Sequence, residues 1–120
     1  MRTSSVNINS SLERQIIKSL VQVLADFDKT EQIDQFVRDF FTKSEIETFS
    51  KRLAIAYWIK KGRSYSNIKN NLKVSSATIA TVATQMKKSG YQQALKQMEA
   101  EEWANVWAKK IESKTRFIRK

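Results

Sequence analysis

The sequence predicts an all-α fold of about six helices that includes a helix-turn-helix. Its 120 residues contain no proline and only two glycines, and apolar residues recur mostly three or four positions apart, the spacing of one helix face. No segment sustains the alternation of polar and apolar residues that marks a strand. The length suits one domain, residues 1–120, and 41% hydrophobic residues are enough for a modest core.

The composition argues against several classes of function. There is no cysteine and no histidine, so thiolate chemistry, the commonest metal ligand and the usual general base are missing. Glu45 and Glu47 fit a helix start better than paired acid–base chemistry. We therefore expect no metal site and no enzymatic activity.

Neither a targeting segment nor a membrane span is evident. The first eleven residues lack the continuous apolar core of a signal peptide, and no run approaches the roughly 18 apolar residues of a spanning helix. This pattern predicts a soluble protein of the cytoplasm.

Positive charge is concentrated in the middle of the chain. Of the net charge of +10, residues 43–89 contribute +8, from ten basic and two acidic side chains, whereas residues 1–42 contribute −1 and residues 90–120 contribute +3. Such an uneven distribution favours a polyanion-binding surface in residues 43–89. A solvated lysine-rich surface is the alternative.

Two amphipathic helices are expected before residue 43. The first runs from about Ser11 to Phe27 with Ser10 or Ser11 as its cap, and the second begins near Thr30, which can cap it. Both are nearly neutral, so we interpret residues 11–42 as a scaffold whose apolar stripes must be covered. These stripes comprise Leu12, Ile16, Leu20, Val23 and Phe27, then Ile33, Phe36, Val37 and Phe40.

A third helix is expected from Thr42 to about Lys61. Thr42 and Glu45 have the spacing of a capping box, in which each side chain accepts a hydrogen bond from the other residue's backbone amide. Gly62 then ends the helix, because glycine readily adopts the left-handed conformation. The predicted buried face consists of Ile46, Phe49, Leu53, Ala56, Tyr57 and Ile59.

Two short helices follow, joined only by `KVS`. Ser64 or Tyr65 opens the first, and Ser75 or Ser76 caps the second, which we take as residues 75–87. Two such helices form a helix-turn-helix if they cross steeply, and the second becomes the reading helix. The inward side chains would be Ile68 and Leu72, then Ile79, Val82 and Met86.

The outward face of residues 75–87 suits a DNA major groove. Small and hydroxyl-bearing side chains allow close approach, hydrogen bonds to base edges and contact with thymine methyl groups, while lysines at the margin meet phosphates. Close packing of a Ser/Thr/Ala face on a neighbouring helix is the alternative. The candidate DNA-binding residues are Ser64, Tyr65, Ser66, Lys69, Lys73, Ser75, Ser76, Ala77, Thr78, Ala80, Thr81, Thr84, Lys87 and Lys88.

From about Phe36 to Met98 the chain resembles the tryptophan-repressor superfamily, and within it the YerC/YecD-type repressor-like proteins. The matching segments are `FVRDFFTKSEIETFSKRLAIAYWIKKG`, `SYSNIKNNLKVSSATIATV` and `SGYQQAL`. The resemblance implies an intertwined all-helical homodimer, residues 11–42 serving dimerisation and residues 43–89 binding DNA. It also implies a bacterial, nucleoid-associated regulator.

The resemblance also bears on a ligand site. In the tryptophan repressor a threonine before the third helix and an arginine within it help bind the corepressor, and Thr42 and Arg52 match them here. A second arginine stacks on the indole, but Thr81 stands in its place, so a guanidinium is missing. We therefore expect no cofactor and weak or no tryptophan binding, with Thr42 acting as a helix cap and Arg52 as a surface or ion-pair arginine. Lys73 occupies a turn position where the family often has glycine.

Residues 90–120 are expected to form a C-terminal helix and a basic tail. Trp103 and Trp107 lie one turn apart, away from the stripe that begins at Tyr91, and `KTRFIRK` follows them. Three interpretations remain open: packing within the dimer, an arm that docks on a membrane surface or partner protein, and a basic arm along DNA.

The leading hypothesis is a sequence-preferring double-stranded DNA-binding protein, a repressor-like transcriptional regulator. The alternative is a protein-interaction or membrane-peripheral module that uses the Trp103/Trp107 patch. Retention by DNA or by anionic lipid at physiological salt separates the two.

Overall fold

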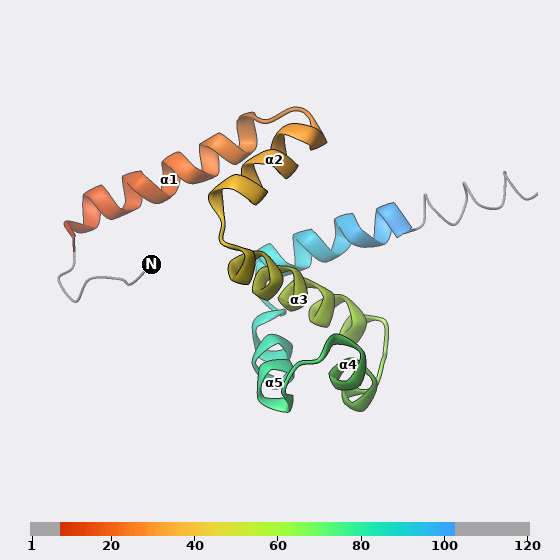
Figure 1. Ribbon diagram of the computed structural model, residues 1–120. Helices are drawn as coiled ribbons and strands as arrows, with labels where there is room; N and C mark the ends of the chain where they lie inside the picture. Colours follow the sequence, from red (N-terminus) through yellow and green to blue (C-terminus); the bar gives the residue numbers. More distant parts are fainter. Residues whose placement is uncertain (1–7, 103–120) are drawn as a thin grey trace, which may run out of the picture. The chain divides into compact units, whose positions relative to one another are not determined.

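The computed structural model describes residues 8–102, and within them every regular element is a helix. The labelled helices are α1 (Ser10–Asp26), α2 (Thr30–Phe40), α3 (Lys43–Lys60), α4 (Tyr65–Leu72) and α5 (Ser76–Gln85), and residues 89–102 are also helical (Figure 1). The predicted all-α class is confirmed. The chain divides into two compact units, Met1–Ile46 and Glu47–Lys120.

The first unit contains α1 and α2, which begin one residue away from the expected caps. Asn9 caps α1, since its side-chain oxygen accepts hydrogen bonds from the amides of Ser11 and Leu12 at 2.8 and 3.3 Å. Asparagine is as good a cap as serine, and it stands one position earlier. Thr30, the expected cap of α2, is its first helical residue. The cap residue is Lys29, which makes no side-chain cap bond.

Aromatic side chains cluster where α1 is followed by α2. The Phe36 ring lies 5.5 Å from Phe27, 4.8 Å from Phe40 and 6.4 Å from Phe41. An open hollow of about 620 Å³ lies beside Phe27, Phe36 and Phe40. Neither α1 nor α2 has a buried residue, so the apolar surface of this unit is left open to solvent within a single chain.

Helix α3 begins and ends as its local sequence predicts. The Thr42 amide donates to Glu45 Oε1 at 2.8 Å, and the Glu45 amide donates to Thr42 Oγ1 at 3.1 Å, which is the reciprocal capping box. Gly62 has φ of 84°, a value that only glycine adopts without strain, and its amide donates to the Ile59 carbonyl.

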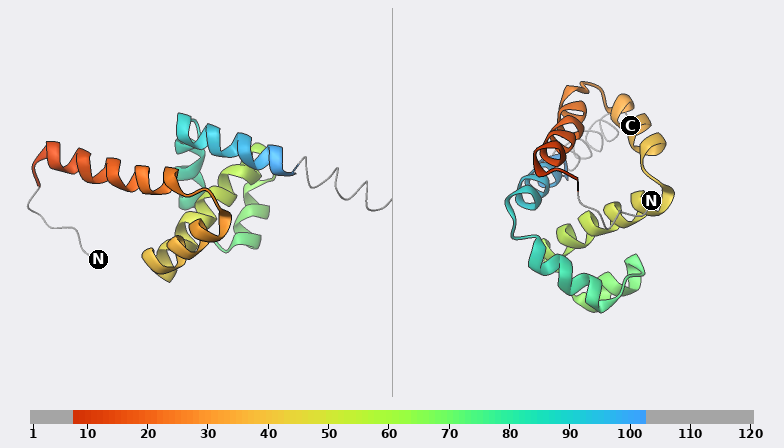
Figure 2. Two further views of the ribbon diagram at one scale, coloured as in Figure 1. Left: turned by 90° about the horizontal axis from the view of Figure 1, so that it is seen from above. Right: turned by 90° about the vertical axis from the view of Figure 1, so that its left-hand side faces the viewer.

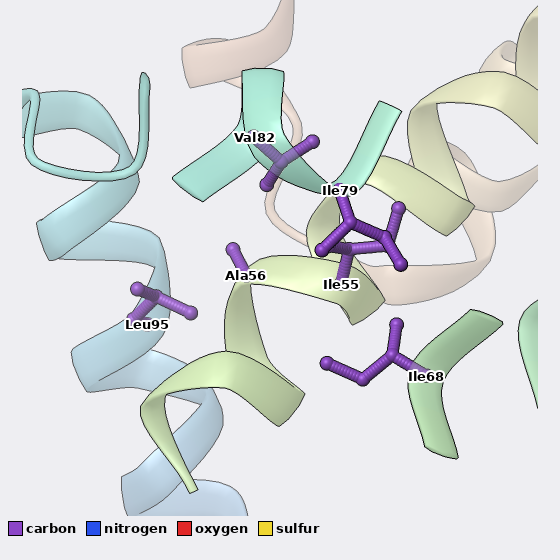
Figure 3. Packing of buried hydrophobic residues seen from close by; sticks show 6 residues of the cluster. All are labelled: Ile55, Ala56, Ile68, Ile79, Val82 and Leu95. Atoms are coloured by element: carbon purple, nitrogen blue, oxygen red, sulfur yellow. The ribbon is translucent and has the colours of Figure 1, made fainter. Parts of the chain in front are cut away.

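The second unit has a small apolar core. Side chains from α3, α4, α5 and helix 89–102 point toward one another there (Figure 3). Six are buried: Ile55, Ala56, Ile68, Ile79, Val82 and Leu95. The expected buried face of α3 was partly wrong, because Ile55 is fully buried whereas Phe49 is 43% exposed.

Two ion pairs join α3 and the turn after it to helix 89–102. Lys60 Nζ lies 3.2 Å from Glu99 Oε1, and Lys61 Nζ lies 3.1 Å from Glu102 Oε2. Together with the burial of Leu95, these contacts fix the helix against α3. No helix among the described residues is long and apolar enough to cross a membrane.

Candidate nucleic-acid interface

Helix α4 is capped by Ser64, whose hydroxyl accepts from the Asn67 amide at 3.1 Å. Ile68 is fully buried and anchors the helix on the core. Tyr65 is 50% exposed, and Ser66 and Lys69 are exposed as well. The core contact therefore turns the polar face of α4 toward solvent.

The turn between α4 and α5 contains Lys73 in the left-handed conformation, with φ 57° and ψ 52°. Its amide donates to the Lys69 carbonyl at 3.0 Å and closes the end of α4. Lysine adopts this conformation at a cost of roughly 1 kcal/mol, because its Cβ approaches the following carbonyl oxygen. The turn thus keeps a shape that favours glycine even though lysine occupies it.

Helix α5 begins as expected and ends earlier than expected. The Ser75 hydroxyl accepts from the Thr78 amide at 3.1 Å and caps the helix. The predicted end at residue 87 is wrong, because α5 ends at Gln85. The Gln92 side chain donates to the Met86 carbonyl at 2.6 Å, so that carbonyl is satisfied from outside the helix. Lys87 and Lys88 consequently lie in the turn that follows α5.

The two faces of α5 differ sharply. Ile79 and Val82 are buried in the core, at 0% and 2% exposure. The opposite face is exposed and carries only small or hydroxyl-bearing side chains: Ser76, Ala77, Thr78, Ala80, Thr81 and Thr84. Among the described residues of the second unit, no helix covers this face, so it is not a packing surface for α3, α4 or helix 89–102.

Two of the three threonine hydroxyls on this face donate to backbone carbonyls of the helix itself. Thr81 Oγ1 donates to the Ala77 carbonyl at 3.0 Å, and Thr84 Oγ1 donates to the Ala80 carbonyl at 3.2 Å. Each oxygen keeps lone pairs that can accept a hydrogen bond, and each side chain also presents a methyl group. This face can therefore accept from amino groups on base edges and contact thymine methyls.

Lysines flank the exposed face of α5. Lys69, Lys73, Lys87 and Lys88 are exposed, and within residues 8–102 none of them is paired with an acid. By contrast, Lys60 and Lys61 are each paired with a glutamate. The unpaired lysines are available to an external polyanion.

All fourteen predicted DNA-binding residues are exposed, and they lie on α4, on α5 or in the turns beside them. Helices α4 and α5 contact each other, and they stay close together in both views of Figure 2. Sequence reasoning left Arg63 out, although it immediately precedes the cap of α4. Its signal was an arginine next to the helix-ending Gly62.

The two candidate ligand residues are engaged within the chain. Thr42 forms the capping box with Glu45. Hydrogen bonds with Thr42, chiefly with its backbone amide and next with its side chain, hold the pKa of Glu45 below its ordinary value. The Arg52 guanidinium lies 5.6 Å from the centroid of the Phe49 ring, within cation–π range. Both residues are exposed.

Trp103, Trp107 and the basic tail lie outside the described residues, and the interpretations offered for them stay predictions. The described residues also hold no group of three or more acidic side chains that could bind a metal ion.

These features define a helix-turn-helix protein, and the comparisons identify its family. The family model for the Trp repressor protein matches residues 15–99, so the chain belongs to the Trp repressor family. A crystal structure from Staphylococcus aureus, of a protein described as a "putative Trp repressor", matches with a TM-score of 0.65 and 29% identity. The match covers 71% of this chain and 87% of that one. None of the curated proteins compared with the sequence matches it.

Members of this family are regulatory DNA-binding proteins and not enzymes. The chain accordingly belongs to a family of regulatory DNA-binding proteins, which agrees with the expectation that it is not an enzyme.

Proposed function

We propose that this protein is a sequence-preferring double-stranded DNA-binding regulator that acts as a homodimer on the bacterial nucleoid. The observation that carries the proposal is the exposed face of α5, where small and hydroxyl-bearing side chains stand opposite the buried Ile79 and Val82. A helix with such a face can enter a major groove without steric obstruction.

Base reading is assigned to the outward residues of α5. The Thr81 and Thr84 oxygens accept hydrogen bonds from base amino groups, while Ala77, Ala80 and the threonine methyls contact thymine methyl groups. A good base contact contributes roughly 1–3 kcal/mol of discrimination. These side chains therefore set which sequence is preferred.

Phosphate binding is assigned to the flanking lysines. Lys69 on α4, Lys73 in the turn and Lys87 and Lys88 after α5 have no acidic partner among residues 8–102, so each charge is free to replace a condensed counterion. Contacts of this kind position the protein without reading sequence.

A second copy of the chain is the proposed cover for α1 and α2. Within residues 8–102, ten of the twelve large hydrophobic residues that are more than a third exposed lie between Ile8 and Phe40. On α1 they span about half the circumference at roughly 100° per residue. Unpartnered apolar surface of this extent marks an interface. The hollow beside Phe27, Phe36 and Phe40 offers space for apolar side chains of the partner.

We also propose that tryptophan does not control this protein. Thr42 is committed to the helix cap, Arg52 stacks beside Phe49, and the Thr81 hydroxyl donates to its own helix. None of the three supplies the second guanidinium that the family uses to hold an indole.

The proposal is tested by selecting duplexes from a random pool with the purified protein and measuring affinity over a salt series. The expected result is an enriched sequence and a log–log salt dependence with a slope of several units. Absence of duplex binding at low salt would refute it. Retention on anionic lipid instead of DNA would favour the Trp103/Trp107 module.

A further inference from the structure

Arg63 is held in one orientation by two side-chain contacts. Its guanidinium lies 4.0 Å from the centroid of the Trp58 ring, and its Nη1 donates to Asn67 Oδ1 at 3.3 Å. Trp58 belongs to α3 and packs against the core, whereas Asn67 is in the first turn of α4. The guanidinium is therefore fixed at the beginning of the helix-turn-helix.

The charge on Arg63 has no acidic partner among residues 8–102. The two cations just before it, Lys60 and Lys61, are paired with Glu99 and Glu102. Arg63 is exposed and carries a positive charge. Among the described residues, Arg63 is thus the cation at this end of α4 that has no acidic partner.

Stacking leaves most of the guanidinium available. The guanidinium lies over the Trp58 ring, and its bond to Asn67 uses only one of the five hydrogen-bond donors of arginine. Planar donors in a fork match two oxygens of a phosphate. Holding the fork in place in the free protein reduces the ordering cost of binding.

We propose that Arg63 is a pre-positioned phosphate contact that extends the DNA interface beyond the fourteen residues found from sequence. The inference rests on the proposed function. It places a bidentate contact at the first helix of the motif, the element that crosses the DNA backbone in helix-turn-helix complexes. Trp58 and Asn67 are positioning residues.

The competing account is purely structural, with Arg63 closing the turn between α3 and α4. The turn already has backbone bonds that do not involve the side chain: the Arg63 amide donates to the Trp58 carbonyl at 3.0 Å, and the Gly62 amide to the Ile59 carbonyl at 2.9 Å. Because these bonds survive truncation of the side chain, Arg63→Ala is expected to fold. The two accounts differ in the salt dependence of DNA binding.

The experiment measures affinity for a selected and a scrambled labelled duplex over a salt series by fluorescence anisotropy, with thermal melting of every variant. Arg63→Ala should lower the salt slope by roughly 0.9 per phosphate, hence by about two units for a dimer. The weakening should be equal on selected and scrambled duplexes, as for any phosphate-binding residue. Arg14→Ala, the same change on exposed α1, should leave the slope unchanged.

Trp58→Leu and Arg63→Lys test the pre-positioning. Trp58→Leu removes the stacked ring and keeps the charge, so affinity should fall several-fold while the slope stays close to wild type. Arg63→Lys should also keep the slope and lose affinity, because lysine lacks the planar fork.

A structural role only would appear as an Arg63→Ala variant that melts earlier yet retains the wild-type slope, and this result would overturn the inference while leaving the proposed function intact. A wild-type protein that does not bind the duplex at all would overturn both.

Discussion

The hydroxyl of Thr42 and the carboxylate of Glu45 each accept a hydrogen bond from the other residue's backbone amide, at 3.1 and 2.8 Å. This pair starts α3, the helix that supplies Ile55 and Ala56 to the core of the second unit. The same bonds engage the threonine that would otherwise be the first candidate for ligand binding. The capping box therefore stabilises the start of α3 and argues against binding of a corepressor at Thr42.

The capping box predicts an acid-sensitive contribution to stability. Hydrogen bonds from Thr42 lower the folded-state pKa of Glu45, so its contribution is fully present above the unfolded pKa of about 4.3 and is lost as pH falls through the lower folded value. Glu45→Gln should therefore melt below wild type near neutral pH, and the difference should vanish at low pH. Melting temperatures of both proteins from about pH 7 to about pH 3 check this.

Glu101→Gln, the same loss of charge at an exposed residue with no ion pair within residues 8–102, corrects for the general effect of net charge. A gap between wild type and Glu45→Gln that is constant across the whole range would contradict the assignment.

Tryptophan is expected to bind weakly or not at all. Thr42 and Arg52 are engaged within the chain, and Thr81 carries no charge to hold an indole or carboxylate. Isothermal titration calorimetry with L-tryptophan should show no saturable heat at micromolar concentrations, which corresponds to a binding free energy weaker than about −8 kcal/mol. Micromolar affinity that disappears in Arg52→Ala would show that the substitution at Thr81 had been interpreted wrongly.

Lys73 should show opposite effects on stability and DNA binding. Its left-handed conformation costs roughly 1 kcal/mol in the folded state, and Lys73→Gly removes this cost. Glycine also makes the unfolded chain more flexible, which offsets part of the gain. The variant should melt up to a few degrees higher than wild type and bind duplex DNA more weakly, because it neutralises one phosphate fewer. Lys73→Asn, neutral and tolerant of this conformation, should behave similarly. A Lys73→Gly protein that melts earlier, or binds as tightly as wild type, would refute the trade-off.

A homodimer is expected in solution, with the α1 apolar face in its interface. Light scattering at micromolar concentration should give twice the chain mass of 13.9 kDa. Ile16→Lys puts a charge into the apolar face and should dissociate or unfold the dimer, whereas Gln22→Lys on the polar face should not. Monodisperse wild-type monomer would remove this part of the account, as would a fully dimeric Ile16→Lys.

Local signals in the sequence were sufficient to place the helix-turn-helix. The starts of α3, α4 and α5 depend on Thr42, Ser64 and Ser75, each of which accepts from the amide three residues further on. Because both partners lie within four consecutive residues, each helix start can be predicted from the local sequence alone. Gly62 likewise marks the end of α3 through its own conformation.

Contacts between distant residues could not be inferred in the same way. The end of α5 at Gln85 depends on Gln92, whose side chain reaches the Met86 carbonyl from the next helix. The burial of Ile55 in place of Phe49 depends on where α4, α5 and helix 89–102 pack. Arg63 was missed because its importance comes from stacking on Trp58, five residues earlier, around a helix end.

The assignment of α5 as the reading helix is tested most directly by comparing Thr81→Ala with Lys69→Ala on a selected and a scrambled duplex across a salt series. Thr81 is on the exposed face of α5, away from the buried Val82, and Lys69 is a cation on α4 with no acidic partner among residues 8–102. Thr81→Ala should lower affinity for the selected duplex by roughly 1–3 kcal/mol per base contact, with little effect on the scrambled one and an unchanged salt slope. Lys69→Ala should lower the affinity for both duplexes alike. It should reduce the salt slope by roughly one unit for each phosphate that is no longer neutralised, doubled in the dimer. If the two variants weaken both duplexes equally, or if neither changes affinity, α5 is not the reading helix.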